Sequence, residues 1–145
     1  IAARGGMLVG SCLAGIAFLK GLGLVHAISH MIGAEYDTQH GLTNAIILPV
    51  ILRYNLPSMN YKVKRMADAM ELHNGSTDSV IAHIETVLDR IGIPKSLSYM
   101  DIPFDCAERI SQKAIQDSAA ETNPRTASVA EIKELVEEAI IGARP

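Results

Sequence analysis

The sequence predicts an all-α fold, a bundle of about six to eight helices. Apolar residues make up 48% of the 145-residue chain but aromatic residues only 4%, and the Ala, Ile, Leu and Met that carry the apolar load favour helices over sheets. Several segments space their apolar residues as one face of a helix does, and no segment alternates apolar and polar residues like a strand. The length suffices for one domain with a hydrophobic core.

Two helices are predicted near the start of the chain. Residues 1–20 are apolar around most of the helix surface, so we predict a helix buried between other helices and ended by Gly21 and Gly23. Residues 24–33 are predicted to form the second helix. A turn-rich connection over residues 35–41 follows it.

Three more helices are predicted in the middle of the chain. Residues 43–54 are predicted to form a helix in which Pro49 causes a kink or an early break, and residues 62–72 are predicted to form a helix with basic residues outward. Residues 77–91 have the most regular amphipathic pattern, which predicts one buried stripe. That stripe consists of Val80, Ile81, Ile84, Val87, Leu88 and Ile91.

The last part of the chain is predicted to hold two helices. Residues 96–102 have an irregular pattern, and a helix over residues 104–119 follows Pro103. Ser128 and Glu131 form an S-x-x-E capping box that begins the final helix. This helix is predicted to bury Val129, Ile132, Val136 and Ile140.

Composition excludes several functions. The net charge of −3 and the lack of a basic patch give no reason to expect a nucleic-acid partner. Cys12 and Cys106 are too few for a disulfide framework, so a reducing cytoplasm is expected and both thiols are predicted to be buried and inert. The apolar run over residues 7–19 is too short to span a bilayer, and no A-x-A site supports the alternative of a signal peptide. Because Ile1 leads straight into this run, we expect a fragment cut inside a helix.

Three of the five histidines lie in residues 21–49. His26 and His30 are four residues apart, so a helix places them on one face, and His40 follows a turn that can fold it back toward them. Imidazole suits iron, zinc, copper or nickel, so this spacing indicates a metal site. Histidines packed or hydrogen-bonded on a buried helix are the alternative. Asp37 is a possible carboxylate ligand, with a turn residue as the other interpretation.

Other motifs are weaker candidates. The sequence HAISH lacks the Glu of H-E-x-x-H, which argues against a zincin-type hydrolase. Residues 21–26 begin like a dinucleotide fingerprint but lack the third Gly and a preceding strand, so a helix junction is expected instead. His73 and His83 are expected to be solvated. Residues 123–125, Asn-Pro-Arg, are expected to form a turn whose Arg pairs with a carboxylate.

The histidine stretch resembles a known family. Residues 21–49, GLGLVHAISHMIGAEYDTQHGLTNAIILP, resemble the signature of the iron-containing, group III alcohol dehydrogenases, which has a G-L-x-H-x-x-x-H core and a P-H-G-x-x-N-A-x-x-L-P tail. Residues 4–18, 92–97 (GIPKSL) and 117–125 (DSAAETNPR) also match the family in the same order. The resemblance therefore extends over essentially the whole chain.

Small departures and one match refine this resemblance. Met31 stands where the family often has Pro or Gln, and Gln39 where Pro usually precedes the His-Gly pair, so a changed turn could shift His40. The related maleylacetate reductases have His in place of the tail Asn. Asn44 therefore indicates the alcohol dehydrogenase branch.

The resemblance implies a division into domains and roles for the histidines. Family members join an N-terminal α/β nucleotide-binding domain to a C-terminal helical domain, and residues 1–145 resemble the helical, metal-binding and catalytic one of the dehydroquinate synthase-like fold. His26 and His40 match two of the four metal ligands, while an Asp and a His come from a helix upstream of Ile1. His30 matches a histidine between the metal and the nicotinamide, so a catalytic, proton-transfer role and contact with the cofactor are implied.

The resemblance implies an iron-dependent alcohol dehydrogenase that interconverts an alcohol and an aldehyde or ketone by hydride transfer with NAD or NADP, with the metal as Lewis acid. Zinc is the alternative to iron, and a maleylacetate reductase-like enzyme or a non-catalytic helical binding module is the alternative function. The isolated chain is expected to be inactive and to bind metal weakly or not at all. The enzyme is expected to be a cytoplasmic homo-oligomer that acts on a small alcohol or aldehyde, with no nucleic acid or membrane as partner.

Overall fold

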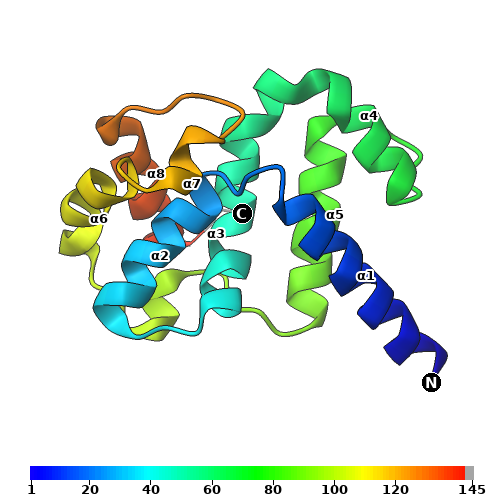
Figure 1. The fold of residues 1–145 in the computed structure, drawn as a ribbon, viewed down its shortest axis with the longest axis horizontal. Helices are drawn as coiled ribbons and strands as arrows, with labels where there is room; N and C mark the ends of the chain where they lie inside the picture. The colour runs from blue at the N-terminus through cyan, green and yellow to red at the C-terminus, as the bar shows by residue number, and fades with distance from the viewer. Residues whose placement is uncertain (143–145) are drawn as a thin grey trace.

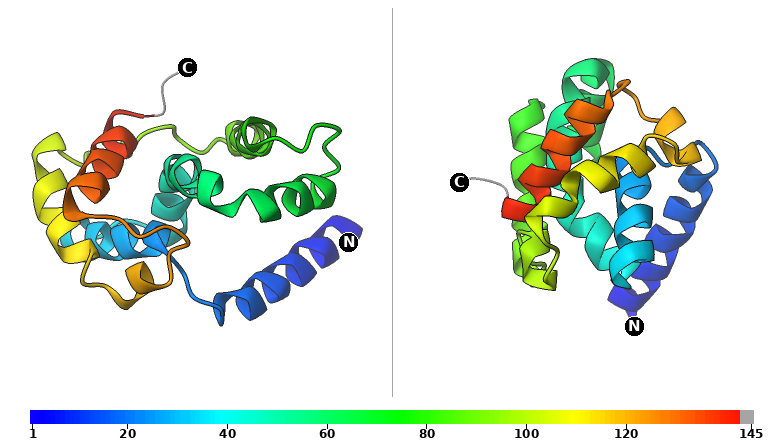
Figure 2. Two further views of the ribbon diagram at one scale, coloured as in Figure 1. Left: turned by 90° about the horizontal axis from the view of Figure 1, so that it is seen from above. Right: turned by 90° about the vertical axis from the view of Figure 1, so that its left-hand side faces the viewer.

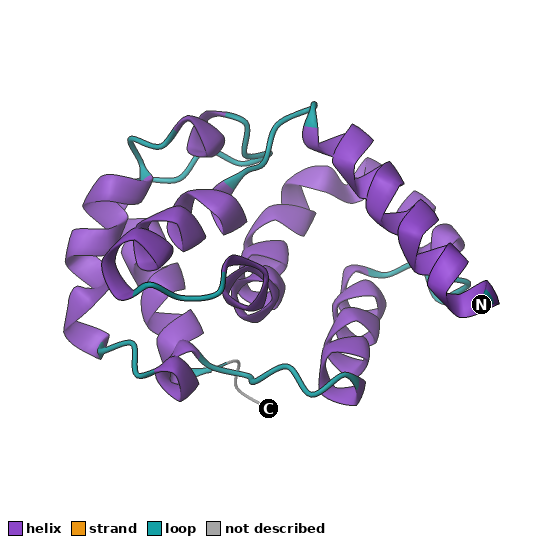
Figure 3. Ribbon diagram, turned by 60° about the horizontal axis from the view of Figure 1, so that its bottom comes forward, coloured by secondary structure: helices purple, strands orange, loops and turns teal. Residues whose placement is uncertain are grey.

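The computed structural model describes residues 1–142, and all regular structure in that part of the chain is helical (Figures 1 and 3). The predicted all-α class is confirmed, with eight α-helices and three short 3₁₀ helices. The α-helices are α1 (Ala2–Phe18), α2 (Leu24–Tyr36), α3 (His40–Asn55), α4 (Asn60–Ala69), α5 (Thr77–Arg90), α6 (Ala107–Ala114), α7 (Ser118–Glu121) and α8 (Val129–Ile141). The 3₁₀ helices are η1 (Leu56–Met59), η2 (Leu97–Met100) and η3 (Phe104–Cys106).

The main hydrophobic core lies among α2, α3, α6 and α8, which pack together in one half of the molecule (Figure 1). Ile28, Ile47, Ile110 and Ile132 come from these four helices and are fully buried. Each of these helices carries apolar residues along one face. The four helices pack together because that arrangement removes these faces from water.

A second, smaller core lies between α4 and α5. Val63 of α4 and Val80 of α5 belong to this cluster and are buried together with Leu56 of η1. Helix α3 joins the two cores, because its middle contributes Ile47 to the first and its last turn leads into Leu56. The predicted stripe on α5 is covered only in part: Ile91 is 66% exposed, because nothing in the described chain packs over the last turn of this helix.

Helix α1 extends away from the rest of the molecule (Figures 1 and 2). The prediction that residues 1–20 form a helix is confirmed, but the prediction that this helix is buried is wrong. Every residue in it is exposed, including Leu13 at 61%, and Cys12 is exposed instead of buried. An apolar pattern shows that a surface needs a partner but not which element supplies one. Among residues 1–142 no helix combines the length and apolar character needed to cross a membrane.

The α2–α3 connection is shorter than predicted. Helix α2 continues to Tyr36, and Asp37 ends it in the left-handed conformation with φ of 51°. Asp37 is thus the predicted turn residue, and its φ lies in the region that Asp tolerates better than most residues. Helix α3 begins at His40, where the Gln39 side chain accepts a hydrogen bond from the Leu42 amide. Only three residues separate the two helices, so α3 folds straight back along α2.

The predicted helix over residues 104–119 is broken in two. It consists of η3, α6 and, after a turn, the separate short helix α7. The break lies where Asp117 adopts an extended backbone conformation and caps α7 by accepting a hydrogen bond from the Ala119 amide. Aspartate at this position competes with helix continuation, because its carboxylate satisfies an amide that would otherwise need the preceding turn.

The predicted capping box of α8 is confirmed. Ser128 Oγ accepts from the Glu131 amide at 3.2 Å, and Glu131 Oε2 accepts from the Ser128 amide at 2.8 Å. Of the residues predicted to be buried by α8, Ile132, Val136 and Ile140 are buried and Val129 is half-buried.

The capping box leads to a stability prediction. Ser128→Ala is expected to lower the free energy of unfolding by about 1 kcal/mol, because it leaves the first amides of α8 without an acceptor. Ser128→Thr keeps the hydroxyl and serves as the control. Urea titrations of the three proteins measure the effect, and equal midpoints would show that solvent caps this helix as well as Ser128 does.

Candidate metal centre

The structure brings the three predicted histidines together. His26 and His30 lie one turn apart on α2, and His40 begins α3 beside them. Their ring centroids lie 5.2 Å apart for His26 and His40, 5.4 Å for His30 and His40, and 5.8 Å for His26 and His30. The short reversal between α2 and α3 produces this cluster, since it places the first residue of α3 next to the middle of α2.

Asn44 connects two of these rings. Its side-chain nitrogen lies 3.0 Å from His40 Nε2 and 3.3 Å from His26 Nε2. Because an amide nitrogen only donates hydrogen bonds, both ring nitrogens accept and must carry free lone pairs. Asn44 Oδ1 is buried without a hydrogen-bond partner among the described residues. The lone pairs of His26 Nε2 and His40 Nε2 are therefore both directed at one position, which the Asn44 side-chain nitrogen occupies.

Ser29 fixes the other side of the His40 ring. Ser29 Oγ lies 3.4 Å from His40 Nδ1 and donates to the His26 carbonyl at 3.3 Å. With its proton committed to that carbonyl, the Ser29 oxygen accepts from the Nδ1–H of His40. This agrees with the lone pair that Asn44 requires on Nε2 of the same ring.

The donor set fits part of a metal site. Burial lowers the pKa of His26, and the neighbouring His40 and His30 lower it further, which favours the neutral ring that a metal ligand must be. Among residues 1–142, however, no group of three or more His, Cys, Asp or Glu side chains is arranged to hold a metal ion. Asp37, the other candidate ligand, is an exposed turn residue. His26 and His40 thus offer two nitrogens, and a complete site needs further ligands.

Asp117 is a site residue that sequence reasoning missed. Its Oδ2 lies 3.0 Å from His30 Nδ1, although 87 positions separate the two residues. Its Oδ1 accepts from the Ala119 amide at 2.8 Å. Burial acts to raise the pKa of Asp117, but the Ala119 amide and the His30 ring outweigh it and lower the pKa overall. The only sequence signal was an Asp inside the family-like segment 117–125, and nothing local indicated its partner.

Residues 117–125 also hydrogen-bond to the start of α2. The Gly23 amide donates to the Ala119 carbonyl at 3.0 Å, and the Leu24 amide donates to Asn123 Oδ1 at 3.1 Å. Gly23 has a φ of 82°, and a Cβ there would lie 3.0 Å from Asn123 Oδ1, so this close approach requires glycine. The amides of the Gly-rich junction are therefore used internally, as expected for a helix junction and not for a phosphate site.

The predicted turn at residues 123–125 is present. Arg125 pairs with Glu131 at 3.1 Å, as expected, and its guanidinium also stacks 3.9 Å above the centre of the Tyr54 ring. His73 is exposed and His83 half-buried on α5, both outside the histidine cluster. Cys106 is buried, and burial raises its pKa, which suits the inert thiol that was predicted.

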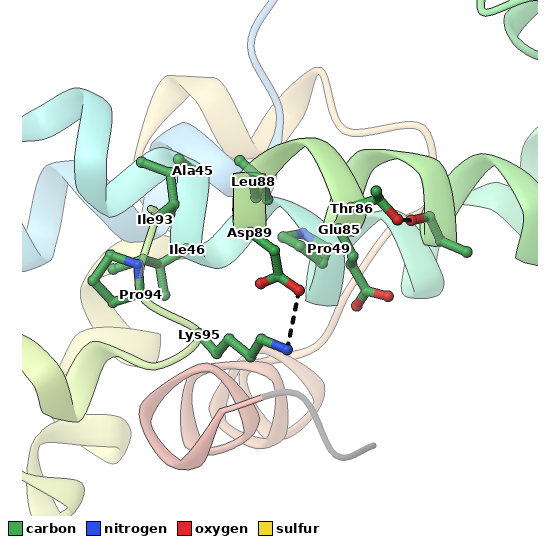
Figure 4. A pocket seen from close by; sticks show the side chains of 11 residues that line it. Ala45, Ile46, Pro49, Glu85, Thr86, Leu88, Asp89, Ile93, Pro94 and Lys95 are labelled. Atoms are coloured by element: carbon green, nitrogen blue, oxygen red, sulfur yellow. Dashed lines mark hydrogen bonds and ion pairs between the residues drawn. The ribbon is translucent and has the colours of Figure 1, made fainter. Parts of the chain in front are cut away.

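A separate cavity lies beside α3 (Figure 4). It has a volume of about 330 Å³ between α3 and α5, with Ile46 and Pro49 on one wall. Asp89 and Lys95 form an ion pair of 3.2 Å at its edge. None of its lining residues is a histidine. Because the reactive groups gather at the histidine cluster, we place the candidate site there and not in this cavity.

Glu35 gives the α2–α6 contact a pH dependence. Arg109 Nε donates to Glu35 Oε1 at 2.7 Å, and Lys113 Nζ lies 3.3 Å from Oε2. The Arg109 hydrogen bond is the main cause that lowers the pKa of Glu35 to about 2 from an ordinary value of 4.5. Because the folded pKa is depressed, this carboxylate stabilises the fold above about pH 4.5, and the contribution is lost as the pH falls toward 2.

Glu35→Gln is therefore expected to weaken the acid sensitivity of the protein. The variant should be less stable than the wild type at neutral pH, and the difference should shrink as the pH falls below about 4.5. Urea midpoints measured from pH 7 to the acid limit test this. Stability curves that stay parallel over that range would show that Glu35 contributes no pH-dependent stability.

Comparison with known proteins identifies the same family in sequence and in structure. The sequence model of the "Fe-containing alcohol dehydrogenase family, C-terminal" matches residues 1–140. The NAD-dependent methanol dehydrogenase of Bacillus methanolicus is 31% identical over 150 residues, which cover 97% of this chain and 39% of that enzyme. The chain therefore spans about two-fifths of the length of this curated relative.

Solved structures share the helical arrangement. An alcohol dehydrogenase from Oenococcus oeni superposes with a TM-score of 0.81 and 30% identity, over 88% of this chain and 35% of that one. A maleylacetate reductase from Agrobacterium tumefaciens superposes with a TM-score of 0.69 and 25% identity, over 86% of this chain and 33% of that one. The fold of residues 1–142 thus occurs in enzymes of two named activities, as one part of a longer chain.

Proposed function

This chain belongs to the Fe-containing alcohol dehydrogenase family, and from that premise we propose that it forms the metal-holding and proton-handling part of an NAD(P)-dependent alcohol dehydrogenase. The reaction interconverts an alcohol and an aldehyde or ketone. The observation that carries the proposal is the pair of imidazole nitrogens, His26 Nε2 and His40 Nε2, which accept from the one amide group of Asn44. Two neutral nitrogen donors directed at one point suit a divalent transition metal.

Each residue of the cluster has a part in this proposal. A divalent metal, iron or alternatively zinc, supplies Lewis acidity toward an alcohol oxygen when bound, and a nicotinamide supplies the hydride acceptor. His26 and His40 would hold the metal through Nε2. Asn44 must turn its amide away to release both lone pairs. His30 takes the proton that the alcohol hydroxyl loses.

The remaining parts of the active site lie outside these 145 residues in this proposal. Two nitrogen donors are fewer than the four ligands that a firmly held metal needs, and the chain spans 39% of the Bacillus methanol dehydrogenase. We propose that a helix upstream of residue 1 on the same polypeptide supplies the other two ligands, and that a separate nucleotide-binding domain supplies the NAD or NADP site. The complete enzyme is then a cytoplasmic homo-oligomer that takes a small alcohol or aldehyde.

The test compares the complete gene product with the 145-residue chain. The complete protein, loaded anaerobically with Fe²⁺, is expected to reduce NAD⁺ or NADP⁺ in the presence of short primary alcohols, with a rate that chelation abolishes and Fe²⁺ restores. The isolated chain is expected to be inactive and to hold little metal. A full complement of metal on the isolated chain, or no alcohol-dependent reduction by the loaded complete protein, would contradict the proposal.

Maleylacetate reduction is the second candidate, because the Agrobacterium reductase shares the fold. The same assay run with maleylacetate and NADH distinguishes it. Activity with maleylacetate and none with alcohols would replace alcohol oxidation as the function. Absence of both activities would favour a helical binding module that retains the histidines.

A further inference from the structure

Asp117 makes two hydrogen bonds that together fix its carboxylate. It lies between α6 and α7, where its Oδ1 accepts from the Ala119 amide at 2.8 Å and its Oδ2 meets His30 Nδ1 at 3.0 Å. The side chain is only 15% exposed. The cap on α7 thus sets where the second oxygen points, and that oxygen reaches the histidine on α2.

An ionised carboxylate accepts hydrogen bonds and donates none, so the proton between the two groups belongs to His30 Nδ1. A neutral ring with its proton on Nδ1 carries a lone pair on Nε2. Among residues 1–142 the bond to Asp117 is the sole hydrogen bond of the His30 ring. The ring is 36% exposed, so solvent or substrate can reach it.

We infer that Asp117 is a positioning residue, which holds His30 with its proton on Nδ1 so that Nε2 is free to accept the proton of the alcohol hydroxyl. The catalytic part of this inference rests on the proposed function. In the proposed reaction a bound nicotinamide would accept the hydride from the alcohol carbon, and the hydroxyl proton would form a new N–H bond at His30 Nε2. Asp117 then accepts from an imidazolium, which an adjacent carboxylate stabilises.

The other histidines of the cluster do not fix the position of the proton on the His30 ring. The other two rings of the cluster lie 5.8 Å and 5.4 Å from the His30 ring, between centroids, and direct their Nε2 atoms at Asn44. Neither hydrogen-bonds His30. Among residues 1–142 no hydrogen bond other than that of Asp117 favours one neutral form of the His30 ring over the other.

The variant Asp117→Asn is designed to change the hydrogen bond to His30 while it keeps the cap on α7. The amide of Asn has one accepting oxygen, and the Ala119 N–H requires an acceptor, so the oxygen must stay on the cap. The NH₂ group then faces His30 Nδ1 and can only donate to it. The ring is forced to move its proton to Nε2, while the fold keeps its cap. We therefore expect Asp117→Asn to reverse the tautomer of His30 while both contacts of residue 117 remain.

The tautomer is measured directly by NMR. Metal-free protein labelled with ¹⁵N-histidine is examined at about pH 9, above the usual titration range of histidine, and His30 is assigned by comparison with His30→Gln. The wild type is expected to show the proton on Nδ1, and Asp117→Asn on Nε2. Asp117→Ser keeps a cap of shorter reach and is expected to show both forms. A wild-type proton on Nε2, or the same tautomer in wild type and Asp117→Asn, would overturn the inference.

Kinetics of the complete, iron-loaded enzyme provide the second readout. Asp117→Asn is expected to lower kcat for alcohol oxidation by about 100-fold, the lower range for losing a proton acceptor, with little change in KM. Glu35→Gln is the matched control, since it removes one negative charge from the α2–α6 contact without touching the His30 ring, and should keep the wild-type kcat. An unchanged kcat in Asp117→Asn would overturn the catalytic part. If the wild type oxidises no alcohol, the proposed function fails, while the tautomer measurement still decides the role of Asp117.

Discussion

In the proposed alcohol dehydrogenase, replacing both His26 and His40 by alanine is expected to empty the metal site of the complete protein and to abolish alcohol oxidation. The two rings supply the nitrogens that converge on Asn44, and residues 1–142 contain no group of three or more metal-binding side chains that could replace them. Losing partners that only orient metal ligands costs about 10- to 100-fold in metal affinity or activity. Loss of two ligands themselves should exceed this range.

The measurement is metal content per protein together with the rate of NAD(P)⁺ reduction. Each single alanine variant is expected to bind iron at least about 100-fold more weakly than the wild type. His73→Ala is the control, because His73 is exposed and lies outside the cluster, and it should match the wild type in both readouts. Wild-type iron content in the double variant would place the metal elsewhere and end the proposal.

Replacing Asn123 by alanine is expected to cause the largest loss of stability among single substitutions of polar residues here. Asn123 Oδ1 accepts from the Leu24 amide at 3.1 Å and from Asn55 Nδ2 at 2.9 Å, and its Nδ2 donates to Asn55 Oδ1 at 2.8 Å. One side chain thus joins the start of α2 to the end of α3 and to the segment before α8. Asn55 is only 6% exposed, so it has little access to water as a replacement partner.

The expected cost of Asn123→Ala is about 3 kcal/mol, since it leaves several polar groups without partners at roughly 1 kcal/mol or more each. That loss corresponds to a fall in Tm of roughly 10 °C for a domain of this size. Thermal and urea unfolding measure it, with Asn74→Ala, at an exposed loop position, as control. A loss below about 1 kcal/mol would show that water replaces these bonds at little cost.

Features that depend on residues close in sequence were predictable. The capping box of Ser128 and Glu131, the turn at Asp37 and the placement of His26 and His30 on one face of α2 all follow from contacts within about four residues. The all-α class followed from helical spacing in the same way. The family was also predictable, because the resemblance of residues 21–49 to the alcohol dehydrogenase signature is a match of residue types at fixed spacing.

Contacts between distant segments were not predictable from such patterns. The helix predicted over residues 104–119 is interrupted because Asp117 caps a new helix and bonds His30, and no local pattern encodes a partner 87 positions away. Helix α1 was predicted as buried because its pattern is apolar, yet its surface is exposed. Asn44 matched the family signature, but its position between two ring nitrogens appears only when α3 folds back on α2.

By itself the sequence determined that this chain is helical, that three histidines share one short stretch, and which family they belong with. Only the tertiary structure decided that Asn44 joins two of the rings, that Asp117 hydrogen-bonds the third, and that Asn123 bonds the start of α2. The reason is physical: spacing along a helix sets which side chains share a face, whereas hydrogen bonds between segments exist only after packing has brought their backbones together.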